Sequence, residues 1–206
     1  MKKILLSIAM MAVSLTSFAQ YSSGGFSLDK ENMYYGVRIG VNIANLSGDF
    51  DLGTKVGMNL AGVIGLRVSN AAPVFLESGL YYTEGGAKKD GVTQSYNCLE
   101  IPLLIKYGFK AGENFAILPY VGPTFAMALK TSTSFKDGKT SLSGDFLEVN
   151  KPNMGFKVGC GAEYNKLYAE LGYQFGITNI ADWPLANGDD ASAHNGAFFF
   201  NVGVNF

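Results

Sequence analysis

The last eleven residues of the chain, 196–206 (GAFFFNVGVNF), alternate between two kinds of side chain. A period of two predicts a β-strand whose two faces meet different surroundings. Strands in soluble proteins are mostly about 5–6 residues long, whereas a transmembrane β-strand needs about 9–11. The stretch therefore indicates the closing strand of a membrane barrel. Its apolar face carries Phe198, Phe200, Val202, Val204 and Phe206, and its other face carries Ala197, Phe199, Asn201, Gly203 and Asn205.

Seven earlier segments alternate in the same way. They cover residues 33–44, 57–69, 73–85, 95–107, 115–130, 153–164 and 167–178. Together with the last strand they predict an all-β fold, an eight-stranded antiparallel up-and-down transmembrane β-barrel. Pro102, Pro119 and Pro123 lie inside these segments, and we expect bulges or locally unpaired positions there because proline cannot donate to the ladder.

The predicted links between strands alternate in length. Three are short (70–72, 108–114 and 165–166), and four are longer (45–56, 86–94, 131–152 and 179–195). Outer-membrane barrels have short periplasmic turns and long extracellular loops. An even number of strands then leaves both termini in the periplasm and forms the extracellular rim from the long links.

The alternation alone does not decide which face meets lipid, since a soluble barrel or sandwich would alternate with its apolar face inward. The apolar face is large on every strand, and an eight-stranded barrel has an interior just wide enough for side chains. We therefore expect the large apolar residues to face lipid and small residues with a few charges to face inward. Aromatic residues at the strand ends are expected to form an interface girdle or to pack against loops: Tyr34, Tyr35, Tyr81, Tyr82, Tyr107 and Tyr164. Only 16% of residues are charged, against about 25% in ordinary domains, and no basic stripe suggests a nucleic-acid partner.

The first 19 residues have the pattern of a signal peptide. Lys2 and Lys3 precede an apolar core at 4–13, and Ser17 and Ala19 place small residues before a cleavage site at Gln20. A membrane-spanning helix needs about 20 apolar residues, more than this core has. We predict export, a periplasmic lead-in at 20–32 and a barrel at 33–206. Without Lys2 and Lys3 the net charge of −1 becomes −3.

Eight charged residues fall on the predicted inward face. They are Arg38, Arg67, Glu77, Glu100, Lys106, Lys157, Glu163 and Glu170. Buried charges must be paired, and four basic with four acidic side chains favour a structural, salt-bridged plug over an open pore. A proton or ion path and a catalytic carboxylate pair remain as alternatives.

Other chemistry is sparse. Ser192 and His194, with Asp189 or Asp190 nearby, could form a lipid-modifying site, and Asp49 with Asp51 could bind Ca²⁺ weakly, but neither set has the spacing of a dedicated site. No zinc, phosphate or dinucleotide motif is present, so we predict no catalytic residues, no metal and no cofactor. Cys98 and Cys160 fall on opposite faces of non-adjacent strands and are expected to be free thiols.

Three segments carry a resemblance to a known family. Residues 99–107 (LEIPLLIKY) resemble the "EIPLLLKY" strand of the small porin-like, or PorT-like, outer-membrane β-barrel family; residues 119–122 (PYVG) and 168–180 (YAELGYQFGITNI) resemble two further strands. The resemblance implies an outer-membrane location and an eight-stranded barrel. One departure is Gly172, where the family's "EARYxxGLTNI" strand has an arginine. The family implies no single activity.

These observations favour a non-enzymatic barrel in the outer membrane of a Gram-negative bacterium, acting through its long loops in envelope integrity, adhesion or partner binding. Expected partners are outer-membrane lipid and lipopolysaccharide, the barrel-assembly machinery, and an extracellular protein or glycan. The alternatives are a small-solute or ion porin, a lipid-modifying enzyme that uses His194, and a component of a protein-secretion system.

The terminal aromatic residue generates a first prediction. Phe206 resembles the C-terminal aromatic that the assembly machinery recognises, so deletion of Phe206 should reduce insertion into the outer membrane. The measurement is the fraction of protein in the membrane and in the heat-modifiable folded form. Normal assembly of the truncated chain would count against Phe206 as an assembly signal.

Overall fold

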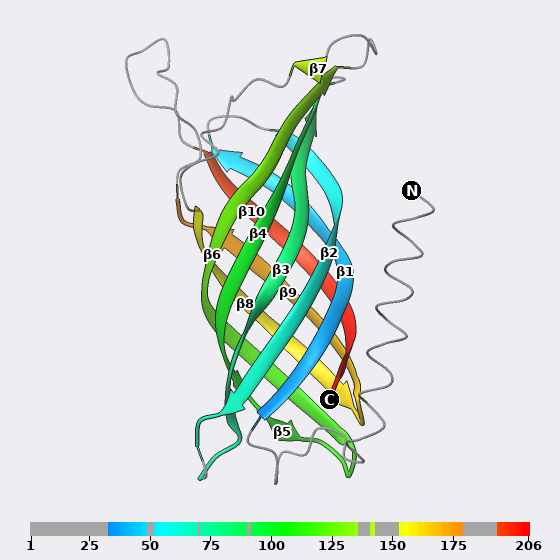
Figure 1. Ribbon diagram of the computed structural model, residues 1–206, viewed down its shortest axis with the longest axis vertical. Coiled ribbons are helices and arrows are strands. Elements are labelled where there is room, and N and C mark those ends of the chain that lie inside the picture. The colour runs from blue at the N-terminus through cyan, green and yellow to red at the C-terminus, as the bar shows by residue number, and fades with distance from the viewer. Residues whose placement is uncertain are drawn as a thin grey trace.

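A computed structural model describes residues 33–48, 52–69, 71–89, 92–135, 141–142, 153–178 and 193–206. The predicted signal peptide and lead-in, residues 1–32, lie outside the described residues. The described chain forms one antiparallel sheet that closes on itself as a barrel with tilted strands (Figure 1). No helix in the described segments is long and apolar enough to cross a membrane.

Eight long strands build the barrel wall, which confirms the predicted fold class. Each pairs antiparallel with its neighbours along the chain, β4 pairs with β6, and β1 pairs with β10 to close the ring. Two segments of two residues, β5 and β7, extend the pairing of β6. The bounds are β1 Met33–Gly48, β2 Leu52–Arg67, β3 Val74–Lys89, β4 Val92–Tyr107, β5 Phe109–Lys110, β6 Phe115–Phe135, β7 Ser141–Leu142, β8 Asn153–Tyr164, β9 Leu167–Gly176 and β10 Ala193–Asn205.

The closing seam joins the last strand to the first along its whole length. The register runs from Gly36 opposite Asn205 to Gly48 opposite Ala193. Beyond it, Tyr35 and Phe206 exchange backbone hydrogen bonds of 3.1 and 2.8 Å, and their rings stack with centroids 5.7 Å apart. The start of β1, the end of β10 and the short β8–β9 turn lie at one end of the barrel, called the turn end here; the opposite end is the loop end (Figure 1).

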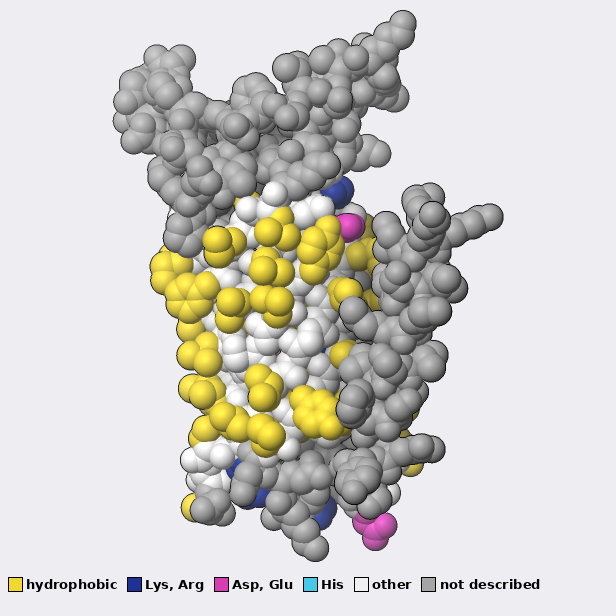
Figure 2. Space-filling model, viewed as in Figure 1, with side chains coloured by type: hydrophobic (Ala, Val, Ile, Leu, Met, Phe, Trp, Pro, Cys, Tyr) yellow, Lys and Arg dark blue, Asp and Glu magenta, His cyan; other side chains and the backbone are white. Residues whose placement is uncertain are grey.

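Large apolar side chains point outward from every strand, as the alternation predicted. Ile39 is 49% exposed, Leu60 48%, Ile105 56% and Phe200 50%, although all lie in the middle of long strands. Figure 2 shows hydrophobic side chains over the middle of the barrel, with Lys, Arg, Asp and Glu near its two ends. An apolar belt between polar ends is what a lipid bilayer requires.

The interior differs from the expected set of small residues. Eight large side chains point inward with exposed fractions of 7% or less: Tyr34, Phe75, Tyr81, Leu104, Leu118, Tyr120, Tyr168 and Phe199. The expectation that large residues would not fit was wrong, and so was the placement of Tyr34 and Tyr81 among the aromatics facing the membrane interface.

Glycines on facing strands make the room for these rings. Tyr34 lies opposite Gly65, where an added Cβ would come within 2.2 Å of the ring. Phe199 lies opposite Gly172, where a Cβ would come within 2.5 Å of the Phe199 ring. The absence of a side chain on one strand is therefore matched to a large ring on the next.

Two of the four links predicted to be long are mostly strand. β1 ends at Gly48 and β2 begins at Leu52, while β3 ends at Lys89 and β4 begins at Val92. Pairing continues beyond the apolar belt, because backbone hydrogen bonds persist where both faces of the strands are polar. The hydrophobic alternation that located the strands disappears there, so the predicted strands end earlier than the observed ones. The predicted two-residue turn at 165–166 is present, and Asn165 adopts the positive φ of 54° that asparagine tolerates.

The three prolines form no register-shifting bulge, but locally unpaired positions, the other expected outcome, lie beside them. The β3–β4 register omits Pro102, and the β4–β6 register omits Pro123 and ends at Tyr120, short of Pro119. Register shifts occur near Ala44, between Thr54 and Asn59, and at Asn97. The pairing of β6 with β8 runs unbroken through Pro119 and Pro123. Along a strand, the backbone N–H and C=O groups of successive residues point alternately to the strand on one side and the strand on the other. Pro119 and Pro123 are four positions apart, so the backbone of both points to β4, and the hydrogen bonds to β8 are unaffected. Beside Pro102, the Ser78 hydroxyl donates to the proline's carbonyl at 2.8 Å.

The matched glycines generate a stability prediction with a control on the same strand. Gly65→Val should lower the free energy of unfolding by about 1–3 kcal/mol, because its side chain would overlap the Tyr34 ring. Gly62→Val should change it by less than about 0.5 kcal/mol, since a Cβ at Gly62 meets nothing within 4 Å. Urea unfolding of the refolded protein in lipid bilayers measures both. Equal losses in the two variants would contradict the proposed matching.

Candidate functional site: the ion-paired lumen

Seven of the eight predicted inward charges are fully inside the barrel. Their exposed fractions run from 0% to 5%: Arg38, Glu77, Glu100, Lys106, Lys157, Glu163 and Glu170. Arg67 differs, because it is half-buried at the end of β2 and donates its Nε to the backbone oxygen of Ser69 at 2.9 Å. The seven buried charges fall into three groups.

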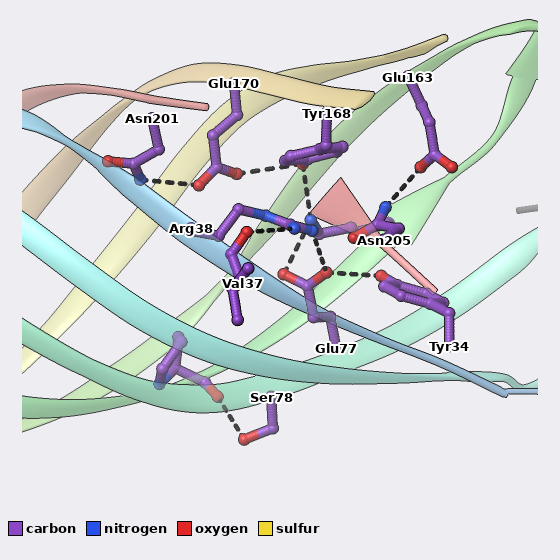
Figure 3. A network of polar contacts seen from close by, with 12 residues as sticks. Tyr34, Val37, Arg38, Glu77, Ser78, Glu163, Tyr168, Glu170, Asn201 and Asn205 are labelled. Carbon is purple, nitrogen blue, oxygen red and sulfur yellow. Dashed lines mark hydrogen bonds and ion pairs between the residues drawn. The ribbon is translucent and has the colours of Figure 1, made fainter. Parts of the chain in front are cut away.

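The first group is centred on Glu77 of β3 (Figure 3). Lys106 Nζ lies 2.8 Å from one carboxylate oxygen of Glu77, and Arg38 Nη2 lies 3.7 Å from the other. The Tyr34 hydroxyl donates to Glu77 at 2.6 Å. One carboxylate therefore joins side chains from β1, β3 and β4, and it offsets the charge of two desolvated cations.

A polar chain leads from Lys106 across the lumen. Lys106 donates to the Tyr168 hydroxyl at 2.8 Å, and that hydroxyl donates to Glu170 at 3.1 Å. The other Glu170 oxygen accepts from Asn201 at 2.8 Å, and Asn201 accepts from Asn59 at 3.3 Å. These bonds link β4, β9, β10 and β2.

An aromatic ring also supports the first group. The Arg38 guanidinium lies 3.9 Å from the centre of the Tyr168 ring, within cation–π range. The sequence pattern alone did not assign Tyr34, Tyr168 or Asn201 to this network. The alternation of side chains indicates which residues point inward, but their hydrogen-bond partners depend on the strand register.

The second group lies nearer the loop end. Lys157 of β8 forms an ion pair with Glu100 of β4, and Gln174 of β9 donates to the other Glu100 oxygen at 2.8 Å. Lys157 also lies 4.5 Å from the centre of the Tyr81 ring and 5.2 Å from that of Phe199. The third group is Glu163 at the turn end, which accepts from Asn205 at 2.6 Å (Figure 3).

The remaining candidates are less constrained. The described residues contain no group of three or more His, Cys, Asp or Glu side chains that could hold a metal ion. Cys98 and Cys160 are free thiols, as predicted, with Cys98 buried on the lumen face. The backbone of His194 pairs with Ser47, but the His194 side chain and Asp49, Asp51, Asp189, Asp190 and Ser192 lie outside what the structure describes.

The barrel has the polarity of a protein whose solvent is lipid. Its exterior is apolar between the two ends, and seven charged side chains lie inside, where they are paired with one another or hydrogen-bonded to neutral side chains. A soluble barrel would show the reverse arrangement. The closed ladder leaves no sheet edge along the eight-stranded wall, as the hydrocarbon core demands. Fold and lumen together define an integral membrane β-barrel.

Comparison with known protein families agrees with this class. A family model described as "Outer membrane protein beta-barrel domain" matches residues 18–182. The chain belongs to this family and is an outer-membrane β-barrel protein. The narrower PorT-like assignment stays a prediction. A comparison with curated protein sequences found no match.

Several solved barrels are similar in outline. Neisserial surface protein A is 17% identical, with 85% of this chain and 98% of that chain covered and a TM-score of 0.48. OprG from Pseudomonas aeruginosa is 12% identical, with 88% and 99% covered and a TM-score of 0.49. The attachment invasion locus protein Ail of Yersinia pestis is 14% identical, with 85% and 100% covered and a TM-score of 0.45. No activity is transferred from these likenesses.

The Glu77 group generates a prediction about stability. Glu77→Gln should lower the free energy of unfolding by about 3–5 kcal/mol, because it leaves Lys106 and Arg38 buried without their carboxylate. Adding Lys106→Met should recover part of the loss by removing one uncompensated charge. Denaturant unfolding in bilayers measures both variants.

Glu113→Gln is the matched control, since Glu113 is exposed in a turn and its loss should change stability by less than about 0.5 kcal/mol. A Glu77→Gln variant as stable as the control would show that the buried ion pairs do not hold the lumen together.

Proposed function

We propose that this protein is a non-enzymatic outer-membrane barrel that conducts no solute and acts at the cell surface through its loop end. In this orientation the turn end and both termini face the periplasm. The proposed roles are envelope integrity, adhesion or the binding of an extracellular protein or glycan, with lipopolysaccharide around the barrel. Assembly would use the barrel-assembly machinery.

The observation that carries the proposal is the filling of the lumen. Across the turn half, buried rings and aliphatic side chains pack into clusters, including Tyr34 with Phe75, Leu118 and Tyr168, and Leu104 with Tyr120 and Phe199. The Glu77 and Glu100 groups also join strands that are not neighbours in the ring, such as β1 with β3 and β4 with β8. An eight-stranded barrel has little interior beyond its side chains, so a filled lumen supports a role other than transport.

The uneven height of the wall supports a role at the loop end. β6 has 21 residues, whereas β8 has 12 and β9 has 10. The loop-end parts of β4 and β6 read VTQSYN and KTSTSF and remain paired with each other as far as Val92 and Phe135. These segments are rich in Ser and Thr, and β4 and β6 extend to the loop end of the barrel, near β7 (Figure 1). A paired sheet of polar sequence at the loop end suits contact with a partner.

Conductance tests the closed lumen. Purified protein inserted into planar bilayers should show no current steps above leak, because the ion-paired and aromatic side chains block the path. Folded protein verified by heat-modifiable mobility is the required control. Reproducible steps well above leak, or swelling of protein-containing liposomes in sugar solutions, would favour the porin alternative.

A surface-binding role is tested separately. Residues 136–152 are replaced by a short Gly-Ser turn, and cells with either version are compared for adhesion, dye entry through the outer membrane, and proteins cross-linked at the surface. The replacement should reduce at least one of these while membrane insertion stays normal. Identical behaviour of the two strains in all three assays would contradict a function at the loop end.

A further inference from the structure

One stretch of the barrel wall has an interrupted ladder on both sides of the same strand. On β4, the pairing with β3 omits Ile101 and Pro102, and the pairing with β6 omits Leu103 and Leu104. The stretch lies within the apolar belt, because Ile101 and Leu103 point outward and are 50% and 43% exposed. The ladder between β1 and β10, which closes the barrel, has no such interruption. Residues 101–104 are called the β4 gap here.

Two prolines account for the interruptions. The backbone of Pro123 points from β6 to β4, where the register places it opposite Leu103. Since successive residues of a strand point to alternate sides, the backbone of Pro102 points from β4 to β3, opposite Gly79. Neither proline has an N–H group, so the carbonyl oxygens of Leu103 and Gly79 each lose a ladder donor. In the hydrocarbon core no water can replace it.

Two contacts hold the β4 gap closed. The Ser78 hydroxyl of β3 donates to the carbonyl oxygen of Pro102 at 2.8 Å. On the other side, Gly122 of β6 comes so close that an added Cβ would lie 2.0 Å from the Leu103 carbonyl oxygen. This approach sets a Cα–H group against that oxygen, and such a contact is weaker than an N–H hydrogen bond. Closure at the β4 gap therefore depends on fewer and weaker bonds than closure along an unbroken ladder.

The side chains of β4 would limit a movement to this stretch. Glu100 and Lys106, on either side of it, are held in ion pairs with β8 and β3. The inward side chains between them, Pro102 and Leu104, are apolar and buried. A local displacement of β4 between the two ion pairs would therefore bring only apolar side chains into contact with lipid, and it would leave every buried charge with its partner.

We propose that the β4 gap is an opening point built into the barrel wall, where β4 separates locally from β3 and β6 while the rest of the barrel stays closed. The ion pairs of Glu100 and Lys106 confine the movement, and the Ser78 hydroxyl restrains it. Opening exposes Leu104, and the lumen cluster that it forms with Tyr120 and Phe199, to the hydrocarbon core. It creates no path for solutes along the barrel axis, and it does not depend on the proposed function at the loop end.

The test is amide hydrogen exchange, followed by NMR on the folded protein in lipid nanodiscs. The amides of Leu103 and Gly79 point across the β4 gap and exchange when it opens. Ile39 and Val202, which face each other in the ladder between β1 and β10, serve as the reference. Exchange at Leu103 and Gly79 should be at least about tenfold faster than at the reference pair. Equal protection of the two pairs would overturn the proposal.

Three variants identify the cause of the exchange. Ser78→Ala removes the bond to Pro102 and should speed exchange at Gly79 by about twofold to tenfold. Pro123→Val returns an N–H donor at an exposed, lipid-facing position and should slow exchange at Leu103 by a similar factor. Pro119→Val is the matched control: it makes the same change on the same strand, beyond the last β4–β6 pair at Tyr120, and should leave the exchange rates in the gap unchanged.

Heat-modifiable mobility confirms that each variant is folded before its exchange is compared. Unchanged exchange at Gly79 in Ser78→Ala would overturn the proposal, and this variant keeps the test decisive if a proline variant does not fold. An effect of Pro119→Val on Leu103 as large as that of Pro123→Val would overturn it as well, because the exchange would then not arise at the β4 gap.

Discussion

Inside this barrel an ionised side chain has only other side chains to replace water, and much of the structure follows from that constraint. Moving an unpaired charge into such a site costs several kcal/mol even after relaxation. Lys106, Arg38 and Glu77 come from three different strands, and each is 1% exposed or less. They meet only when β1, β3 and β4 have the correct register. A slip of any one of these strands by one residue would turn its charged side chain toward lipid and leave the others without it. The ion pairs thus destabilise structures with a wrong register more than they stabilise the correct one.

Ring and glycine matching imposes a second, steric constraint on the same register. The interior is too narrow for aromatic residues on every strand, so a large ring on one strand needs a gap on its neighbour. Tyr34 beside Gly65 and Phe199 beside Gly172 satisfy this condition. Electrostatic pairing and steric matching act together in the turn half of the lumen.

The sequence predicted what depends on alternation and missed what depends on register. The period-two alternation of side chains predicts eight strands and the outward face of each. It also predicts that Cys98 and Cys160 are free thiols, because it places them on opposite faces of non-adjacent strands. The structure confirms these predictions. The loop-end parts of β3 and β4 were missed because both faces there are polar. The inward position of Tyr34 was missed because an aromatic near a strand end resembles an interface residue. The Glu77 group could not be assembled, since its pairs join positions 39 and 29 residues apart whose separation across the barrel depends on shear.

The closing strand shows how these constraints combine. The buried groups contain three cations and four carboxylates, so not every carboxylate can have a cation of its own. Glu163 and Glu170 accept instead from Asn205 and Asn201, both of which lie on β10. Neutral amide donors stabilise the negative charge without adding another cation that would itself need a partner. Asn201 also accepts from Asn59 of β2. The side chains of β10 therefore bond to β2, β8 and β9, and its backbone pairs with β1 and β9, so the strand that closes the barrel also supplies neutral donors to two of its four buried carboxylates.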